Sequence, residues 1–301
     1  MTYREAILLG ESILQKAKIV DAKNDAWLLL AMACRIDHTY YYVHMDEEMS
    51  QEQIREYQAL LSKRAERIPL QYIVGEQEFM GLKFRVNSNV LIPRQDTETL
   101  VEEALKVIEP GMRVLDLCAA PGGKSTQLAT YLGDSGLLVS NEINTQRSRI
   151  LSQNIERMGI KNAIVTNEDS FVLASHFPGF FNAIQVDAPC SGEGMFRKLP
   201  EAIEQWSMEN VAICAARQKE ILDNAAVMLK PGGVIVYSTC TFSKEENEDV
   251  IEYFLERHPD FTLEEMERFW PHKVDGEGHF VAKLVRRGSV NELGADYDVC
   301  E

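Results

Sequence analysis

Several features that define particular protein classes are missing from this 301-residue sequence. Its six cysteines include no CxxC pair, which argues against a zinc site and a disulfide framework, so we expect reduced thiols and no bound metal. No stretch approaches the roughly 20 apolar residues of a membrane-spanning helix, and the first residues do not resemble a signal peptide. These absences predict a cytoplasmic globular protein that binds no membrane.

Positive charge is also scarce. Lysine and arginine number 31 against 47 acidic residues, and the net charge is −16. A broad phosphate-binding surface is therefore disfavoured, and any RNA contact must use a local patch or a separate partner. Four cations are candidates for phosphate contacts, although isolated surface cations are more often simply solvated. They are Arg147, Arg149, Arg197 and Lys198.

The N-terminal third reads as helices followed by a hairpin. Residues 1–68 carry apolar positions at helical spacing and predict a small helical domain. Glycines and prolines then punctuate two short alternating runs, Gln77–Met80 and Lys83–Val86, which predict a hairpin. An acidic first turn opens a predicted helix over Asp96–Ile108. Residues 69–108 are thus expected to form a hairpin and a linker helix.

The larger part of the chain, residues 109–288, alternates strands with helices such as Thr145–Met158 and Val211–Leu229. This alternation predicts an α/β fold, an open and mostly parallel sheet covered on both faces. Ser243 and Glu246 have the spacing of a capping box that opens a further helix. Residues 289–301 are expected to be a tail. The predicted strands are Arg113–Leu117, Leu137–Asn141, Ala163–Asn167, Asn182–Asp187, Val234–Ser238, Phe261–Met266 and His279–Val285.

A glycine-rich turn, DLCAAPGGKST at Asp116–Thr126, follows the first of these strands. It is neither a phosphate loop, because Cys118 stands at the first glycine position, nor a GxGxxG fingerprint. Glu142 ends the next strand, where a carboxylate can accept both hydroxyls of a ribose, and Asp169 could meet a base. The alternative is a purely structural turn. With the two spaced acids, the pattern favours a nucleoside cofactor without pyrophosphate, such as S-adenosylmethionine.

Two strands, IQVDAPC and VIVYSTC, each end in a cysteine, Cys190 and Cys240. In a parallel sheet both thiols would reach one edge, where Lys124 and helix N-termini could favour a thiolate. A thiolate that attacks carbon 6 of a pyrimidine makes carbon 5 nucleophilic, and a carboxylic acid at Asp187 would stabilise the adduct at ring nitrogen 3. The alternative is that both cysteines merely pack at strand ends.

From about residue 109 to 287 the chain resembles the bacterial RNA 5-methylcytosine methyltransferases of the Nol1/Nop2/Sun family, in the branch acting on small-subunit ribosomal RNA. The motifs are DLCAAPGGKS, NE, VDAPCSGEGMFRK, ARQKEIL, YSTCTFSKEENE and GEGHFVAKL. The resemblance implies a Rossmann-like class I methyltransferase sheet, Cys240 as covalent nucleophile, and Cys190 as the thiol needed for product release. It also implies an S-adenosylmethionine pocket lined by Cys118, Ala119, Ala120, Pro121, Gly122, Gly123, Lys124, Glu142, Asp169 and Asp187.

Residues 1–108 resemble a different family. Pro69–Leu105 is similar to the N-terminal region of the protein-glutamine methyltransferases that modify peptide-chain release factors, where a helical domain and hairpin recognise the protein substrate. The NPPY motif of that family is absent, and the equivalent strand end reads DAPC. Three functions stay open: RNA cytosine-5 methylation, which the site chemistry favours, release-factor glutamine methylation, and non-catalytic binding of the cofactor or a release factor.

Overall fold

The computed structural model describes residues 1–79, 81–88, 92, 105–196, 200–272 and 277–288. The chain divides into two compact units, residues 1–93 and 94–301, and each is described by itself. The predicted helix over Asp96–Ile108 lies outside the described residues as far as residue 104. Within the described part of the chain, no helix combines the length and the apolar character that crossing a membrane requires.

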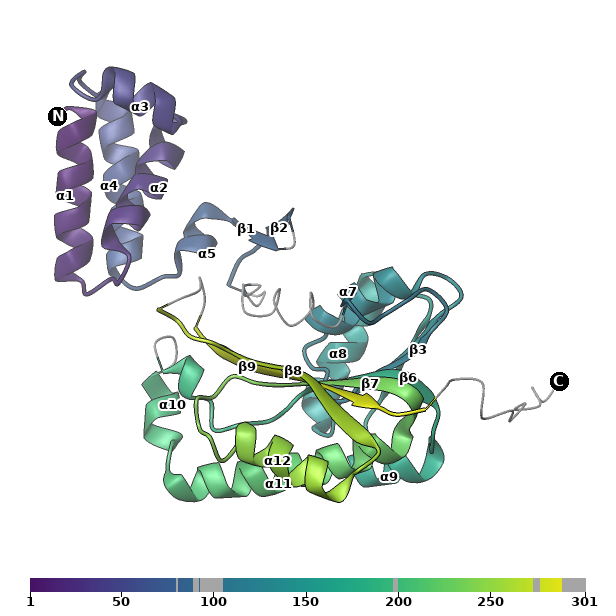
Figure 1. Ribbon diagram of the computed structural model, residues 1–301. Helices are drawn as coiled ribbons and strands as arrows, with labels where there is room; N and C mark the ends of the chain where they lie inside the picture. Colours follow the sequence, from purple (N-terminus) through teal and green to yellow (C-terminus); the bar gives the residue numbers. More distant parts are fainter. Residues whose placement is uncertain (80, 89–91, 93–104, 197–199, 273–276, 289–301) are drawn as a thin grey trace. The chain divides into compact units, whose positions relative to one another are not determined.

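The first unit is a small helical domain followed by a hairpin (Figure 1). Capping boxes formed by Thr2 with Glu5 and by Ser50 with Gln53 begin its first and fourth helices. The core is apolar, and the hydroxyl of the fully buried Tyr57 donates to the Ala26 carbonyl at 3.2 Å. The helices are α1 (Tyr3–Lys16), α2 (Ala22–Cys34), α3 (His38–His44), α4 (Gln51–Ala65) and α5 (Leu70–Val74).

The hairpin of this unit is a two-stranded antiparallel sheet formed by β1 (Glu76–Phe79) and β2 (Leu82–Arg85). Phe79 is paired with Leu82 across a turn in which Gly81 has a φ of +72°, a conformation that favours glycine. The two strands begin one residue earlier than the sequence pattern predicted, and the hairpin itself is confirmed.

The second unit is built on a seven-stranded sheet with the order β5-β4-β3-β6-β7-β9-β8. The strands from β5 to β7 are mutually parallel, whereas β9 runs antiparallel to both of its neighbours. The predicted open, mostly parallel sheet is therefore confirmed. The strands are β3 (Arg113–Asp116), β4 (Leu137–Asn141), β5 (Ala163–Thr166), β6 (Phe181–Asp187), β7 (Leu229–Thr239), β8 (Phe261–Phe269) and β9 (His279–Arg286).

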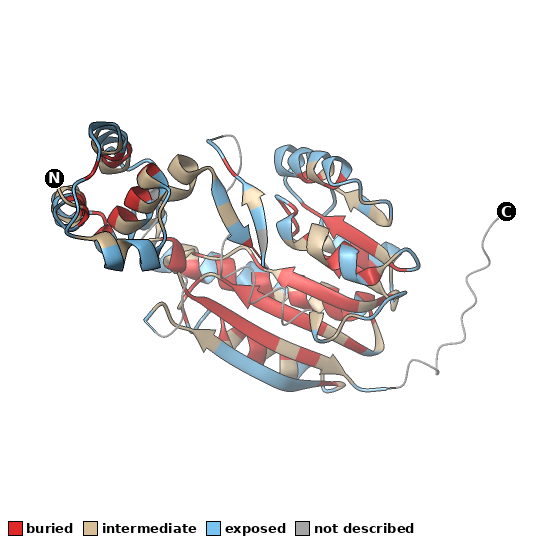
Figure 2. Cartoon of the chain, turned by 90° about the horizontal axis from the view of Figure 1, so that it is seen from above, coloured by how far each residue is buried: buried red, intermediate tan, exposed pale blue. Residues whose placement is uncertain are grey.

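Helices cover both faces of the sheet (Figure 1). On one face lie α7 (Gly123–Leu132) and α8 (Thr145–Arg157), and on the other lie α9 (Ser170–His176), α11 (Met208–Met228) and α12 (Glu248–Arg257). A short 3-10 helix, η1 (Glu193–Met195), and α10 (Pro200–Gln205) lie between β6 and α11. Because both faces are covered, the central strands are buried almost throughout (Figure 2).

Side chains of the central strands alternate between the two layers of helices. Val114 and Ala183 pack with Leu128 of α7 in one apolar cluster. Their chain neighbours Leu115 and Ile184 point the opposite way and pack in the larger cluster that holds residues of α11 and α12. The strand periodicity of two thus divides one continuous apolar run between two cores, and the strand ends remain available for polar side chains.

Candidate active site

The polar residues gather where the strand order reverses, between β3 and its neighbours β4 and β6. In open α/β sheets ligands bind at this point, outside the carboxyl ends of the strands. Asp116, the last residue of β3, is fully buried and accepts a hydrogen bond of 2.6 Å from the Ser125 hydroxyl. Burial raises the pKa of Asp116. This contact ties the start of α7 to the end of β3.

The glycine-rich turn lies between these two anchored residues. Gly122, with a φ of +106°, precedes α7, and a side chain there would come within 2.8 Å of Leu151. Beside Gly123, by contrast, there is open space. Helix α8 holds the rest of the turn, because Arg147 donates to the Ala120 carbonyl at 2.9 Å and Asn154 to the Pro121 carbonyl at 2.8 Å. Hydrogen bonds from α8 thus hold the backbone of the turn, which stays accessible at Gly123.

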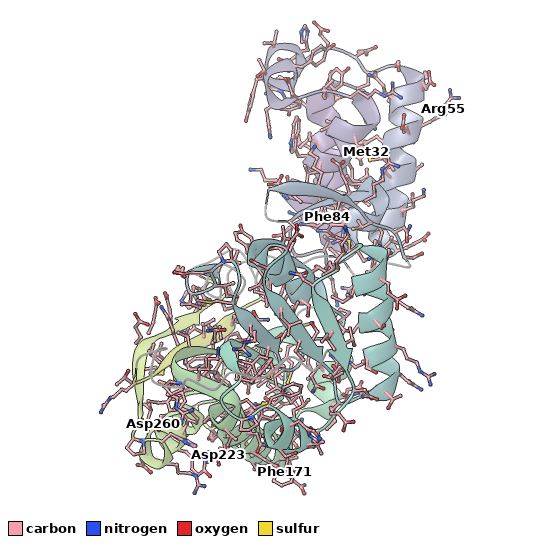
Figure 3. The ribbon with its side chains drawn as sticks, turned by 90° about the vertical axis from the view of Figure 1, so that its right-hand side faces the viewer. Met32, Arg55, Phe84, Phe171, Asp223 and Asp260 are labelled. Carbon is pink, nitrogen blue, oxygen red and sulfur yellow. The ribbon has the colours of Figure 1, made fainter. Side chains whose placement is uncertain are left out.

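Two carboxylates follow the next strands, as the sequence predicted. Glu142 is buried directly after β4, where its Oε1 accepts the backbone N–H of Asn144 at 2.9 Å and its Oε2 lies 3.4 Å from Arg147. Asp169 is exposed after β5 and caps α9 by accepting the N–H of Phe171 at 2.8 Å. The Phe171 ring beside it is 68% exposed and lies on the surface (Figure 3).

These residues fit S-adenosylmethionine. The turn supplies backbone that a ligand can approach at Gly123, and α7 presents its N-terminal amides there. Glu142 and Asp169 stand after neighbouring parallel strands, so they share one edge of the sheet with the turn. A carboxylate after β4 is suited to the two ribose hydroxyls. Among the described residues, no cluster of histidine, cysteine and acidic side chains is arranged to hold a metal ion.

Lys124 and Asp187 form an ion pair beside the turn. Their Nζ and Oδ2 atoms are 2.6 Å apart, and Ser238 donates to the other carboxylate oxygen at 3.1 Å. Burial by itself would raise the pKa of Asp187, but the Lys124 charge, the His279 side chain and the hydrogen bonds from Lys124 and Ser238 together outweigh burial and lower it. The ion pair favours an ionised Asp187, and the role of Asp187 as a carboxylic acid toward ring nitrogen 3 stays a prediction. Asp187 is an acceptor, and Lys124 carries the proton.

The two strand-end thiols meet. Cys190 and Cys240 are 50 positions apart in the chain, yet their Sγ atoms are 3.3 Å apart. The parallel pairing of β6 with β7, which sets Asp187 opposite Ser238, brings both loops to one edge. The hydrogen bond with Cys240, together with burial, raises the pKa of Cys190 well above its ordinary value. Two thiols this close hold at most one negative charge near neutral pH.

The surrounding charges distinguish the three thiols of the site. Burial would lower the pKa of Lys124, but Asp187 raises it, and ionised Cys240 acts in the same direction. A thiolate on Cys240 is thus stabilised by the Lys124 ammonium. For Cys118, burial and the nearby carboxylates raise the pKa strongly, so this thiol stays neutral in the turn. Cys34 and Cys214 lie in helices of the two units, as expected of packed cysteines.

Two expectations for the surroundings of the site change. Ser243 and Glu246 form no capping box, because α12 begins at Glu248 and Ser243 donates to Glu245 instead. Glu246 is buried and accepts hydrogen bonds from the Cys190 loop, a role that sequence reasoning missed. Of the proposed phosphate contacts, Arg147 donates to the glycine-rich turn and Arg149 is exposed. Arg197 and Lys198 lie outside the described residues.

The sheet order and this edge are those of a Rossmann-like methyltransferase fold. A solved structure described as NSun6 from Pyrococcus horikoshii with SFG is 29% identical, with a TM-score of 0.58 over 66% of this chain and 53% of its own. Residues 104–285, more than half of the chain, match the family 16S rRNA methyltransferase RsmB/F, and the chain belongs to this family. A methyltransferase homolog protein from Pyrococcus horikoshii, 23% identical with a TM-score of 0.58, shares the fold over 86% of this chain and 98% of its own.

Curated relatives carry the name ribosomal RNA small subunit methyltransferase F. The protein of Shewanella amazonensis is 39% identical over 199 residues, 60% of this chain and 43% of the relative. That of Klebsiella pneumoniae is 40% identical over 200 residues, 61% of this chain and 42% of the relative. The match thus spans less than half the length of these relatives. Residues 5–75 match a different family, the PrmC N-terminal domain.

Proposed function

We propose that this protein transfers a methyl group from S-adenosylmethionine to carbon 5 of a cytosine in RNA, with ribosomal RNA as the substrate class. The observation that carries the proposal is the pair of thiols, Cys190 and Cys240, 3.3 Å apart beside the Lys124–Asp187 ion pair. Methyl transfer to an amide or a hydroxyl needs no thiol, whereas carbon 5 of cytosine is unreactive until a nucleophile adds to the ring. The family match over residues 104–285 supports the same chemistry.

Cys240 is the nucleophile in this proposal. Its sulfur, as a thiolate favoured by Lys124, adds to carbon 6 of the cytosine and forms a carbon–sulfur bond, which places electron density on carbon 5. S-adenosylmethionine supplies an electrophilic methyl group at that carbon. The ionised Asp187 accepts a hydrogen bond from the amino group of the cytosine, and the Lys124 ammonium beside it donates to the adjacent ring nitrogen.

Cys190 acts in product release. After methylation carbon 5 still holds its proton, and release passes that proton to a water molecule while the ring double bond re-forms and the bond from Cys240 to carbon 6 breaks. Loss of the proton and departure of the Cys240 thiolate restore the aromatic ring together. The S–H of Cys190 donates a hydrogen bond to the Cys240 sulfur. This bond stabilises the negative charge that forms on that sulfur as it leaves carbon 6.

The substrate-selecting surface is a second part of the proposal. The match of residues 5–75 to the PrmC N-terminal domain favours a peptide-chain release factor as a partner of the first unit. Glutamine methylation of that factor is the alternative activity, and DAPC in place of NPPY at the end of β6 speaks against it. Either substrate class favours a cytoplasmic location.

Methyl transfer from labelled cofactor to ribosomal RNA and to release factor tests these functions together. We expect labelled 5-methylcytosine from the wild type, none from Cys240→Ala, and an RNA adduct stable in denaturing gels from Cys190→Ala. Label in the release factor that survives Cys240→Ala would overturn the proposal in favour of the second activity. Cofactor binding without transfer to either substrate would leave the non-catalytic function.

A further inference from the structure

Glu246 is a buried acid that the chemistry above does not use, and it is hydrogen-bonded to the Cys190 loop. Its side chain is fully buried between β7 and α12, and within the described residues it forms no ion pair. One carboxylate oxygen, Oε1, has no hydrogen-bond partner in the part of the chain that is described. A buried carboxylate without a cation costs stability that an apolar side chain would not, so its presence calls for a role.

The other oxygen, Oε2, holds the Cys190 loop. It accepts the backbone N–H of Ser191, the residue after Cys190, at 2.9 Å. It also accepts the side-chain amide of Gln218 on α11 at 2.9 Å, and the same amide donates to the carbonyl of Pro189, the residue before Cys190, at 3.0 Å. The Glu246 carboxylate and the Gln218 amide are therefore hydrogen-bonded to the backbone on both sides of Cys190.

The backbone of Glu246 belongs to the loop that carries the other thiol. Its carbonyl accepts the buried Tyr237 hydroxyl of β7 at 2.8 Å, three residues before Cys240. The two loops are joined again where Ser191 and Thr241, each the residue after a cysteine, share a hydroxyl hydrogen bond of 2.9 Å. Glu246 is thus connected to the chain beside both thiols.

We propose that Glu246 is a positioning residue that holds Cys190 against Cys240, and that its removal slows release of the methylated RNA more than formation of the adduct. The inference rests on the proposed function. Attack by Cys240 needs only its own loop, which β7 anchors, whereas release needs the sulfur of Cys190 within hydrogen-bond distance. The Glu246 carboxylate also adds, after the Cys240 contact and burial, to the groups that keep Cys190 protonated.

Three variants separate positioning from folding. Glu246→Ala removes the acceptor, Glu246→Gln keeps an amide oxygen that can accept from Ser191 and Gln218, and Glu245→Ala is a matched control on an exposed neighbour. We expect Glu246→Ala to lower turnover about tenfold while the denaturant-stable RNA adduct accumulates above the wild-type level. Glu246→Gln should recover most of the turnover, and Glu245→Ala should match the wild type. A misfolded protein would lose adduct and turnover together.

A second measurement needs no RNA. Diamide, an azo compound that takes up two electrons and two protons from two thiols, oxidises neighbouring cysteines to a disulfide, and peptide mass spectrometry quantifies the Cys190–Cys240 product. We expect its rate of formation to fall about tenfold in Glu246→Ala and to stay at the wild-type value in Glu245→Ala. An unchanged rate overturns the positioning role even if the wild type methylates RNA. A reduced rate supports it even if RNA methylation by the wild type fails.

Discussion

The Lys124–Asp187 ion pair offers the sharpest test of the electrostatics of the site. Replacing Lys124 with methionine keeps most of the side-chain stem and removes the charge, so that Asp187 stays at the end of β6 without its cation. The 2.6 Å contact and the partial burial of both side chains make the pair tightly coupled. We therefore expect Lys124→Met to destabilise the second unit, and Asp187→Asn in the same chain to reverse most of the loss.

The magnitude follows from distance and exposure. Two unit charges about 4 Å apart attract by about 4 kcal/mol at an effective dielectric constant of about 20. Breaking a fully buried pair by removing one partner costs about 3–5 kcal/mol, since the remaining charge is left desolvated. Because 18% of the Lys124 and 26% of the Asp187 side chain stay exposed, water screens the pair in part. We expect Lys124→Met to cost about 2–3 kcal/mol of unfolding free energy.

The pH dependence has a definite sign. In the wild type the folded-state pKa of Asp187 lies below its unfolded value of about 3.9, so its stabilisation is complete above about pH 4 and is lost as pH falls through the lower folded pKa. In Lys124→Met, burial without a cation raises the pKa of Asp187 above the unfolded value. Protonation then relieves the penalty, and the stability difference between the two proteins narrows as pH falls toward the unfolded Asp pKa of about 3.9.

Urea unfolding in a Trp27→Phe background measures this difference, because the other two tryptophans, Trp206 and Trp270, both lie in the second unit. The double-mutant cycle of Lys124→Met with Asp187→Asn gives the coupling energy directly. A coupling energy below about 0.5 kcal/mol, or a stability difference that does not change with pH, would refute the assignment of a charged pair.

Three further outcomes concern the turn, the acid after β4 and the first unit. Gly122→Ala puts a side chain on a residue whose φ is +106° and directs it toward Leu151. The change should lower the free energy of unfolding by about 1–3 kcal/mol and weaken S-adenosylhomocysteine binding in calorimetry. Glu142→Gln should weaken the same binding at least about tenfold, and an unchanged affinity would exclude Glu142 from the ribose site. Tyr57→Phe removes the hydrogen bond to Ala26 and should lower the stability of the first unit by about 1 kcal/mol in thermal unfolding, with cofactor binding as the control.

The sequence predicted the sheet well because its strands are buried on both faces and read as short apolar runs between turn signals. Leu137–Asn141 was predicted to the residue, whereas β7 begins at Leu229, before the predicted Val234. A Pro-Gly-Gly run at residues 231–233 reads as punctuation, yet the strand continues through it. The pairing with β6 shifts register across this run, from Phe181–Leu229 to Ala183–Val234, so the turn signal marks a bulge within the strand.

The site was predicted in its composition and less well in its interactions. Strand-end position placed Cys190 and Cys240 at one edge, but no pattern in the sequence shows that their sulfurs touch. Glu246 was assigned to a cap because the spacing from Ser243 suits one, while its actual partners lie 28 and 55 positions away in the chain. Likewise the protonation of Asp187 depends on Lys124, 63 positions away. Contacts of this kind arise only from the tertiary structure.

The pairing of β6 with β7 has a consequence for how such a chain can diverge. Strand register, rather than the length of the connecting chain, sets where the two thiol loops begin, and Glu246 and Gln218 secure the loops afterwards. Because η1 is itself bonded to the Cys240 loop through Gly194 and Glu193, only the excursion through α10 can lengthen, shorten or change its surface while the reacting sulfurs stay in place. Related chains can therefore keep the same pair of reacting thiols while the surface that selects the substrate changes.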